Sequence, residues 1–292
     1  MKYGLVDIGS NTVVLVIYNV TDLNTMPTYL VHESNAVRLV SYIKDGHMQE
    51  EGIQKAVHVL HEYKDILEQN KVEQAFAFIT EPARGIDNCQ QMLDAFQESG
   101  FTVQALTGKE EAEFDFFGSQ LAYSQIASGN AFDIGGGSTE FITFKDHSIV
   151  EATSIPYGCV RLSQLPLDFN LVNKIVSDTL LQYPLLNSIK NEVLIGIGGT
   201  CRAVYKLMDA TYHTGQLMDV KQIQTLYQML IEQDSATINQ MKKVINKDRQ
   251  AVLLPGMNML LAIANQFQAT QIRFSPGCVR EGFLYHQIKD SF

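Results

Sequence analysis

The chain has 292 residues, a formal net charge of −10 and 46% hydrophobic residues, and its mean hydropathy is −0.03. At roughly 150 residues per domain this length predicts two globular domains, and the apolar content excludes a disordered or fibrous chain. The acidic balance disfavours a nucleic-acid scaffold, because no overall positive field exists to displace counterions from a duplex. A polyanionic ligand would therefore need local arginines, backbone N–H groups and a metal ion.

Neither a membrane segment nor an export signal is predicted. The richest apolar stretch, residues 252–264, is interrupted by Pro255, Gly256 and Asn258, and a membrane helix needs roughly 20 apolar residues. The apolar run at residues 13–17 is too short for the core of a signal peptide. The four cysteines lie at least 42 residues apart (201 − 159) without a C-x-x-C pair, which disfavours disulfides and zinc. We expect a cytoplasmic protein with reduced thiols.

The first predicted element is a β-hairpin over residues 2–20. Its strands flank the turn Asp7-Ile8-Gly9-Ser10-Asn11, and its second strand is rich in β-branched residues. Residues 49–69 carry apolar side chains every three or four positions, which predicts an amphipathic helix. Further elements then follow in alternation: a strand over 74–80, a helix over 87–99, a strand over 101–106 and a helix opening at Gly108.

The hairpin pattern returns at residues 130–144, around the turn Asp133-Ile134-Gly135-Gly136-Gly137-Ser138. The two aspartates are 126 residues apart (133 − 7), an offset that indicates duplication of a domain-sized unit. The later predicted elements are helices over 172–190, 220–233 and 256–267 and a strand over 192–197. Strands alternating with helices in both halves predict α/β layers. The boundary is expected within residues 119–129, where small and polar residues cluster.

Both hairpin turns have the composition of a loop that binds phosphate and a metal. A glycine-rich bend points several backbone N–H groups into one concavity, and an aspartate at the strand end can orient a hydrated Mg²⁺. The alternative is that the glycines only supply the positive φ of a tight turn. The repetition of Asp-x-Gly in both halves favours the phosphate-binding interpretation.

A third glycine loop, Gly196-Ile197-Gly198-Gly199-Thr200, follows an apolar strand and precedes a helix. This order can place an anion on the N–H groups at the helix N-terminus. Close packing of the helix on the strand is the alternative. The spacing is not G-x-G-x-x-G, so a dinucleotide site is not favoured.

Seven short motifs occur along the chain, at residues 7–12, 80–88, 108–112, 133–140, 158–162, 196–200 and 275–282. As a set and in this order, they closely resemble the motifs of the exopolyphosphatase and guanosine pentaphosphate phosphohydrolase family. This resemblance implies an α/β, actin-like fold of two ribonuclease-H-type domains with the active site in the cleft between them. The expected domains are residues 1–122 and 123–278, with a C-terminal helix, residues 279–292, packing back on the first.

The resemblance also implies Mg²⁺-dependent removal of terminal phosphate from inorganic polyphosphate or guanosine pentaphosphate. Glu111 would activate water, and Arg84 and Glu140 would complete the catalytic set. Asp7, Asp133 and Glu140 would hold the metal. The phosphate-binding residues would be Gly9, Ser10, Asn11, Asn88, Gly136, Gly137, Ser138, Thr139, Gly198, Gly199 and Thr200.

Several of these roles have structural alternatives. Glu110 and Glu111 could be first-turn acids that the helix dipole stabilises. Arg161, Arg202 and Arg280 are as compatible with structural ion pairs as with substrate contacts. Cys201 is expected to be a buried, inert thiol rather than an oxidation-sensitive one.

Two other functions share the fold. An actin-like kinase or ATPase would need an acceptor pocket, and Glu111 in the helix-opening motif favours water as the acceptor. An inactive polyphosphate-sensing or nucleotide-sensing module would have little use for so many carboxylates near phosphate without a cation. The additional helical domains of long family members do not follow Gly282. The short form is therefore expected to prefer short polyphosphates or guanosine pentaphosphate, or to lengthen its groove as a homodimer.

Overall fold

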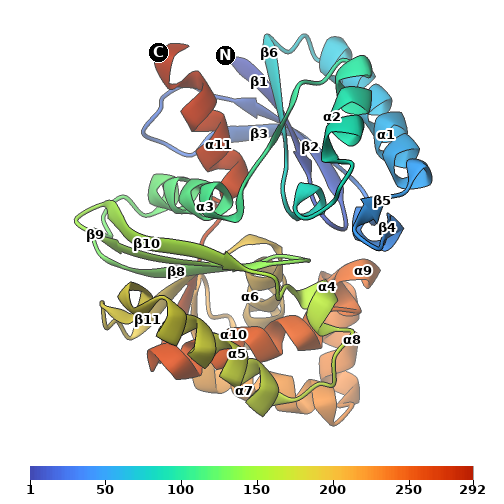
Figure 1. The fold of residues 1–292 in the computed structure, drawn as a ribbon. Helices are drawn as coiled ribbons and strands as arrows, with labels where there is room; N and C mark the ends of the chain where they lie inside the picture. The colour runs from blue at the N-terminus through green and yellow to red at the C-terminus, as the bar shows by residue number, and fades with distance from the viewer. Residues whose placement is uncertain (292) are drawn as a thin grey trace. The chain divides into compact units, whose positions relative to one another are not determined.

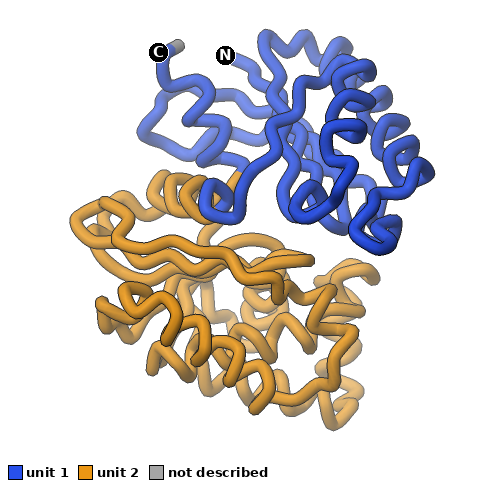
Figure 2. Tube along the Cα trace, viewed as in Figure 1, with its two compact units in different colours: residues 1–111, 280–292 blue, residues 112–279 orange. Residues whose placement is uncertain are grey.

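The computed structural model describes residues 1–291. By its internal contacts the chain divides into two units, residues 1–111 with 280–292 and residues 112–279 (Figure 2). The division falls inside helix α3 (Gly108–Ala122), whereas the sequence led us to expect it after residue 122. The physical reason is that the later turns of α3 pack on the second unit, where the Phe116 and Phe144 ring centroids are 5.1 Å apart.

The first unit is built on a five-stranded sheet in the order β3-β2-β1-β6-β7 (Figure 1). The strands are β1 (Lys2–Ile8), β2 (Val13–Asn19), β3 (Thr28–Asn35), β6 (Gln74–Ile79) and β7 (Val103–Ala105). A small hairpin, β4 (Ile43–Lys44) with β5 (His47–Met48), precedes the long helix. The helices are α1 (Glu50–Gln69), α2 (Cys89–Glu98) and α11 (Val279–Ile288), with 3-10 turns at Leu39–Tyr42, Glu81–Ala83 and Lys289–Ser291.

Helices cover both faces of the first sheet, which explains why β1 and β2 are almost continuously apolar. Val6, Leu15 and Ile79 belong to the core shared with α1 and α2. Side chains of the opposite parity face α11, and the rings of Phe78 and Phe283 lie 4.8 Å apart between their centroids. Residues from the end of the chain therefore complete the core of the unit that begins at the N-terminus.

The second unit has a six-stranded sheet in the order β10-β9-β8-β11-β13-β12. Its strands are β8 (Gly129–Ile134), β9 (Thr139–Lys145), β10 (Ser148–Ile155), β11 (Val193–Ile197), β12 (Leu217–Asp219) and β13 (Gln271–Phe274). Its other helices are α4 (Cys159–Leu162), α5 (Phe169–Gln182), α6 (Gly198–Tyr212), α7 (Val220–Ile231), α8 (Ser235–Val244), α9 (Lys247–Gln250) and α10 (Leu253–Phe267), with a 3-10 turn at Pro184–Asn187. One face of this sheet packs in a core with α5, α6 and α10, and α3 contacts the other face through Phe116.

The two hairpins repeat in register as well as in sequence. Asp7 pairs with Val14 across β1 and β2, and Asp133 pairs with Glu140 across β8 and β9. Each turn closes with the same hydrogen bond, because the N–H of Gly9 donates to the Thr12 carbonyl at 3.0 Å and that of Gly135 donates to the Ser138 carbonyl at 3.0 Å. The predicted duplication is thus present as equivalent backbone structure.

The predicted elements form, but some helices begin or end at other residues than the sequence predicted. The helix expected over 172–190 stops at Gln182, because Pro184 cannot continue it and begins a 3-10 turn. The helix expected from Gly256 starts at Leu253, since proline is tolerated in the first turn of a helix. Among residues 1–291 no helix combines the length and the apolar character that crossing a membrane requires.

Candidate functional site

The Arg84 and Glu111 side chains form an ion pair in the first unit. The Nη1 atom of Arg84 lies 2.8 Å from Oε2 of Glu111, and the two side chains are 25% and 14% exposed. Arg84 follows the 3-10 turn after β6, and Glu111 lies in the first turn of α3. The structure thus brings together two residues that are 27 positions apart in the chain.

The neighbouring acid, Glu110, has a different task. Its carboxylate accepts hydrogen bonds from the N–H and the hydroxyl of Thr107, both at 2.8 Å. The Glu110 N–H in turn donates to the Thr107 hydroxyl at 3.2 Å. This reciprocal arrangement is a capping box, which satisfies N–H groups at the start of α3. Of the two acids, Glu110 therefore has the helix-terminal role and Glu111 faces the arginine.

The turn of the first hairpin, which connects β1 to β2, is held by hydrogen bonds from other parts of its own unit. The Ser10 hydroxyl donates to Oε2 of Glu81 at 2.9 Å in a buried position. The carbonyl groups of Ser10 and Asn11 accept from the N–H groups of Val40 and Arg38, at 3.1 and 2.8 Å. These bonds fix the shape of the turn that carries three of the predicted phosphate-binding residues.

Asp7, at the end of β1, is 18% exposed and lies 3.6 Å from Nη1 of Arg280 on α11. Burial raises the pKa of Asp7 to about 6, the Arg280 guanidinium opposes this rise and the Glu281 carboxylate adds to it. Arg280, whose role the sequence left open, makes this ion pair. A bound cation would favour the charged form of the carboxylate in the same way as Arg280 does.

In the second unit, Asp133 and Glu140 are directly opposite each other on adjacent antiparallel strands, so their side chains emerge on the same face of the sheet. Glu140 is 1% exposed, and its Oε1 accepts a hydrogen bond from the Ser154 hydroxyl at 2.6 Å. At the equivalent position of the first unit the strand carries Val14. At these paired strand positions the second hairpin therefore carries two carboxylates where the first carries one.

The third loop packs directly behind the second turn. Gly198 has a φ of +74°, and a Cβ there would lie 2.1 Å from both carboxylate oxygens of Asp133. The Thr200 hydroxyl donates to the Ile134 carbonyl at 2.6 Å, and the Thr139 hydroxyl donates to the Tyr157 carbonyl at 2.7 Å. The Gly198 and Thr200 contacts pack the third loop against the end of β8, and the Thr139 contact fixes the start of β9 independently of that loop.

The turn residues Gly136, Gly137 and Ser138 are backed by the start of α4. The N–H groups of Cys159 and Val160 donate to the carbonyls of Gly135 and Gly136, both at 2.9 Å. A Cβ at Gly158 would lie 2.4 Å from the carbonyl carbon of Gly136. Only glycine permits this approach of two backbones.

The sequence did not point to Arg249, on the short helix α9. Its Nη2 atom would lie 2.5 Å from a Cβ at Gly199, and its Nη1 atom is 3.7 Å from Sγ of Cys159. The guanidinium thus lies beside the third loop and α4. No local motif surrounds this arginine, so only the fold could place it there.

Cys201 lies near the start of α6, directly after the third loop, and is fully buried. Burial raises the pKa of its thiol well above the usual value, and the Asp133 and Asp115 carboxylates add to the rise. The thiolate is the reactive form of cysteine. Cys201 is therefore an inert thiol at ordinary pH, as expected from the sequence.

Carboxylates of the kind that bind Mg²⁺ occur at both turns. Within the described part of the chain, no three His, Cys, Asp or Glu side chains come close enough together to form a metal site. Mg²⁺ commonly uses only one or two carboxylates and completes its shell with water and substrate phosphates. The single Asp7 in one unit and the Asp133–Glu140 pair in the other fit that chemistry.

The order and direction of the strands in the two sheets identify the fold class. Two units, each with a β-hairpin that opens into a mixed sheet flanked by helices, form the duplicated α/β architecture of the actin-like fold. The chain belongs to the Ppx/GppA phosphatase family, whose family model matches residues 16–291.

Similar proteins extend over nearly the whole chain. A Haemophilus influenzae protein assigned as an exopolyphosphatase is 24% identical, over 98% of this chain and 91% of its own length. The structure of the Aquifex aeolicus PPX-GPPA enzyme matches with a TM-score of 0.79 at 24% identity, covering 98% of this chain and 99% of the other. An exopolyphosphatase from Cytophaga hutchinsonii matches with a TM-score of 0.86 at 23% identity, covering 99% and 98% of the two chains. At these identities the structures establish the fold.

Proposed function

We propose that this member of the exopolyphosphatase family is a Mg²⁺-dependent hydrolase that releases terminal phosphate from inorganic polyphosphate or guanosine pentaphosphate. The observation that carries the proposal is the Arg84–Glu111 pair at 2.8 Å. Hydrolysis of a phosphoanhydride needs a group that orients or deprotonates water and a positive charge that stabilises the transferred phosphoryl oxygens. The pair supplies one group of each kind.

In this proposal Glu111 accepts a proton from the attacking water, while Arg84 binds the phosphoryl oxygens. A guanidinium suits this second role because its planar donors match the geometry of phosphate. The existing ion pair orients the Glu111 carboxylate, so that an attacking water can donate to it. Substrate phosphate would then compete with Glu111 for the guanidinium and release the carboxylate toward the water.

The backbone N–H groups of the two hairpin turns are the proposed phosphate ligands. The hydroxyls of Ser10 and Thr139 already donate to acceptors of the protein, and so does that of Thr200. We therefore assign to these hydroxyls the task of shaping the turns, and we assign anion binding to the N–H groups of Gly136, Gly137, Gly198 and Gly199. The N–H of Gly9 already closes its own turn on the Thr12 carbonyl.

Asp7, Asp133 and Glu140 would hold Mg²⁺ together with the substrate. When bound, the ion would offset the negative charge of the phosphate oxygens. Cross-strand carboxylates such as Asp133 and Glu140 repel each other in a buried setting, and a cation would remove that repulsion. These three carboxylates therefore favour a metal ion that binds together with the polyanionic substrate.

The test is phosphate release from polyphosphate, guanosine pentaphosphate and ATP with and without Mg²⁺. Glu111→Gln should lower kcat by about 10²- to 10⁴-fold, because the amide cannot accept the proton from water. KM should change little, since the amide oxygen can still accept from Arg84. Glu110→Gln is the matched control and should keep wild-type activity, because an amide oxygen can still accept the hydrogen bonds from Thr107.

Two results would contradict the proposal. Wild-type protein that releases no phosphate from any of the three substrates would exclude the activity. A Glu111→Gln variant that hydrolyses at the wild-type rate would assign water activation to another residue.

A further inference from the structure

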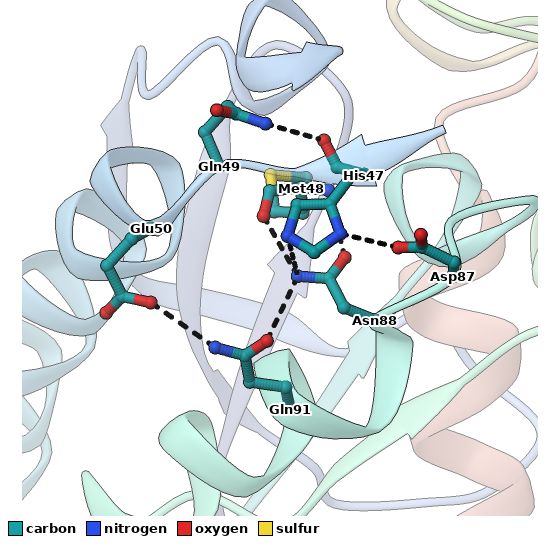
Figure 3. Close-up of polar contacts among 7 residues, drawn as sticks. All are labelled: His47, Met48, Gln49, Glu50, Asp87, Asn88 and Gln91. Atoms are coloured by element: carbon teal, nitrogen blue, oxygen red, sulfur yellow. Dashed lines mark hydrogen bonds and ion pairs between the residues drawn. The ribbon is translucent and has the colours of Figure 1, made fainter. Parts of the chain in front are cut away.

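The loop that carries Arg84 is attached to the small β4–β5 hairpin, as Figure 3 shows. The N–H of Asp87 donates to the carbonyl of Gly46 at 2.9 Å. Gly46 and Gly85 have φ angles of +77° and +78°, values that glycine adopts readily. The two backbones can therefore meet at this point, three residues beyond Arg84.

Asn88 makes the main side-chain connection. Its Oδ1 accepts from the N–H of Met48 at 2.9 Å, and its Nδ2 donates to the carbonyl of Met48 at 2.9 Å. The amide group thus pairs with both backbone groups of one residue in β5. Nδ2 also lies 3.3 Å from Nε2 of His47 and 3.3 Å from Oε1 of Gln91 (Figure 3).

These contacts occupy the polar groups that a substrate phosphate would need. The asparagine amide has two donor hydrogens and one acceptor oxygen. The Nδ2 hydrogens are directed at Met48 and its neighbours, and the carboxamide oxygen is no ligand for an anion. To bind phosphate, Asn88 would have to release the hairpin.

The other end of the same loop is fixed as well. Arg84 donates its N–H to the carbonyl of Glu81 at 2.9 Å, and Glu81, which is 5% exposed, accepts the Ser10 hydroxyl at 2.9 Å. Arg84 is thus held between an attachment to the first hairpin turn and an attachment to β5.

We propose that Asn88 is a positioning residue, which acts on the reaction through Arg84 by tying the Arg84 loop to the β4–β5 hairpin. This inference rests on the proposed function and differs from the substrate-binding role that the family resemblance implied for Asn88. The His47–Asp87 pair supports the same attachment, with 2.7 Å between Nδ1 and Oδ1. Because those side chains are 48% and 69% exposed, the pair adds little stability, and the partly buried contacts of Asn88 with the Met48 backbone are the stronger attachment.

The first arm of the test is a double-mutant cycle on kcat/KM for phosphate release. Asn88→Ala should lower kcat/KM about 10- to 100-fold, mainly through kcat, because a displaced guanidinium no longer matches the transition state. In an Arg84→Ala background the same change should alter kcat/KM by less than about twofold, because the residue through which Asn88 acts is then gone. An equal loss in both backgrounds would mean that Asn88 contacts substrate itself, and would overturn the proposal.

The second arm does not depend on activity. In hydrogen exchange, the amides of Asp87 and Met48 should exchange faster in Asn88→Ala than in the wild type, because both lose their partners when the hairpin separates. Unchanged exchange would overturn the proposal whichever substrate the protein uses. Wild-type protein without phosphatase activity would instead contradict the proposed function and leave the exchange result to decide the attachment.

Two further variants complete the design. Asn70→Ala is the matched control, because the Asn70 side chain also donates to a backbone carbonyl, that of Ile66 at 2.8 Å, but lies outside the loop and the hairpin. It should change neither kcat/KM nor exchange at Asp87.

Asp87→Ala is the second variant, for use if Asn88→Ala fails to fold. It removes an exposed side chain and should leave folding intact. The backbone amides of residue 87 and Met48 should exchange faster than in the wild type, but by less than in Asn88→Ala. If neither amide exchanges faster, the result contradicts the attachment.

Discussion

Tyr285, on α11, is an ionisable side chain whose surroundings oppose its charged form. The ring is 8% exposed, and the hydroxyl donates to the backbone carbonyls of Asp22 and Thr25. Burial raises the pKa of Tyr285 to about 12, and the Asp22 and Glu281 carboxylates add to the rise. The unfolded chain releases this proton near the ordinary pKa of about 10.

The stability of the protein should therefore fall as pH rises from about 10 to about 12. In that window the unfolded state loses the tyrosine proton while the folded state retains it, so ionisation favours unfolding. Below the window both states are protonated and the effect is absent. Tyr285→Phe should be less stable at neutral pH, because the hydrogen bond that the hydroxyl shares between the two carbonyls is lost, but its free energy of unfolding should fall less steeply by about 1 to 2 kcal/mol across the window.

Urea unfolding at several pH values measures both quantities. Tyr183→Phe is the control for removing a tyrosine hydroxyl from a partly buried position. Parallel curves for wild type and Tyr285→Phe would show that this residue does not control alkaline stability.

At the scale of elements, helix α11 begins with a cap that another helix supplies. The N–H of Val279 donates to Oδ1 of Asp115 at 2.8 Å in a buried position. The contact joins α3 to the start of the helix that carries Arg280 and Glu281. The Glu281 carboxylate, 0% exposed, is in turn held by the Tyr18 hydroxyl at 2.5 Å.

Asp115→Ala should lower the free energy of unfolding by about 1 to 3 kcal/mol, because a buried N–H loses its partner. Asp115→Asn should lose less, since an amide oxygen can still accept the bond. Asp168→Ala is the matched control. Asp168 caps its own helix, α5, in an exposed position, and its loss should cost ~1 kcal/mol. Thermal melts that rank Asp115→Ala no lower than Asp168→Ala would contradict the importance of the buried cap.

At the scale of the whole molecule, each unit has a hydrophobic core of its own. One cluster of buried side chains extends from Val6 to Val103 and another from Phe132 to Phe274, each within one unit. Phe283, Leu284 and Ile288 at the end of the chain are 2%, 0% and 0% exposed. The first unit is therefore discontinuous in sequence, and its stability depends on residues that follow the whole of the second unit.

Phe283→Ala should destabilise the first unit by about 3 to 5 kcal/mol, because it removes the ring that packs on Phe78. Hydrogen exchange should then accelerate in β1, β2 and β6 and remain slow in β8 and β11. Phe132→Ala, at 1% exposure in the core of the second unit, should give the opposite pattern. Equal acceleration everywhere in both variants would show that the two cores unfold as one.

The structural features that depend only on residues close together in the chain could be predicted from the sequence. The two turns form as expected, since glycine, aspartate and β-branched residues determine hairpin geometry within about ten positions. The strands β3 and β10 were missed, because they are edge strands with mostly exposed or mixed side chains, and the periodicity that reveals a half-buried strand is weak there.

The sequence by itself therefore determined the α/β class, the duplicated aspartate-bearing turns and the family. Only the tertiary structure decided the partners of Asn88, Arg249 and Asp115. The Asn88 amide meets a residue 40 positions away, and Asp115 meets one 164 positions away. Such contacts depend on how sheets and helices pack in three dimensions, and no periodicity or short motif in the chain encodes a particular distant partner.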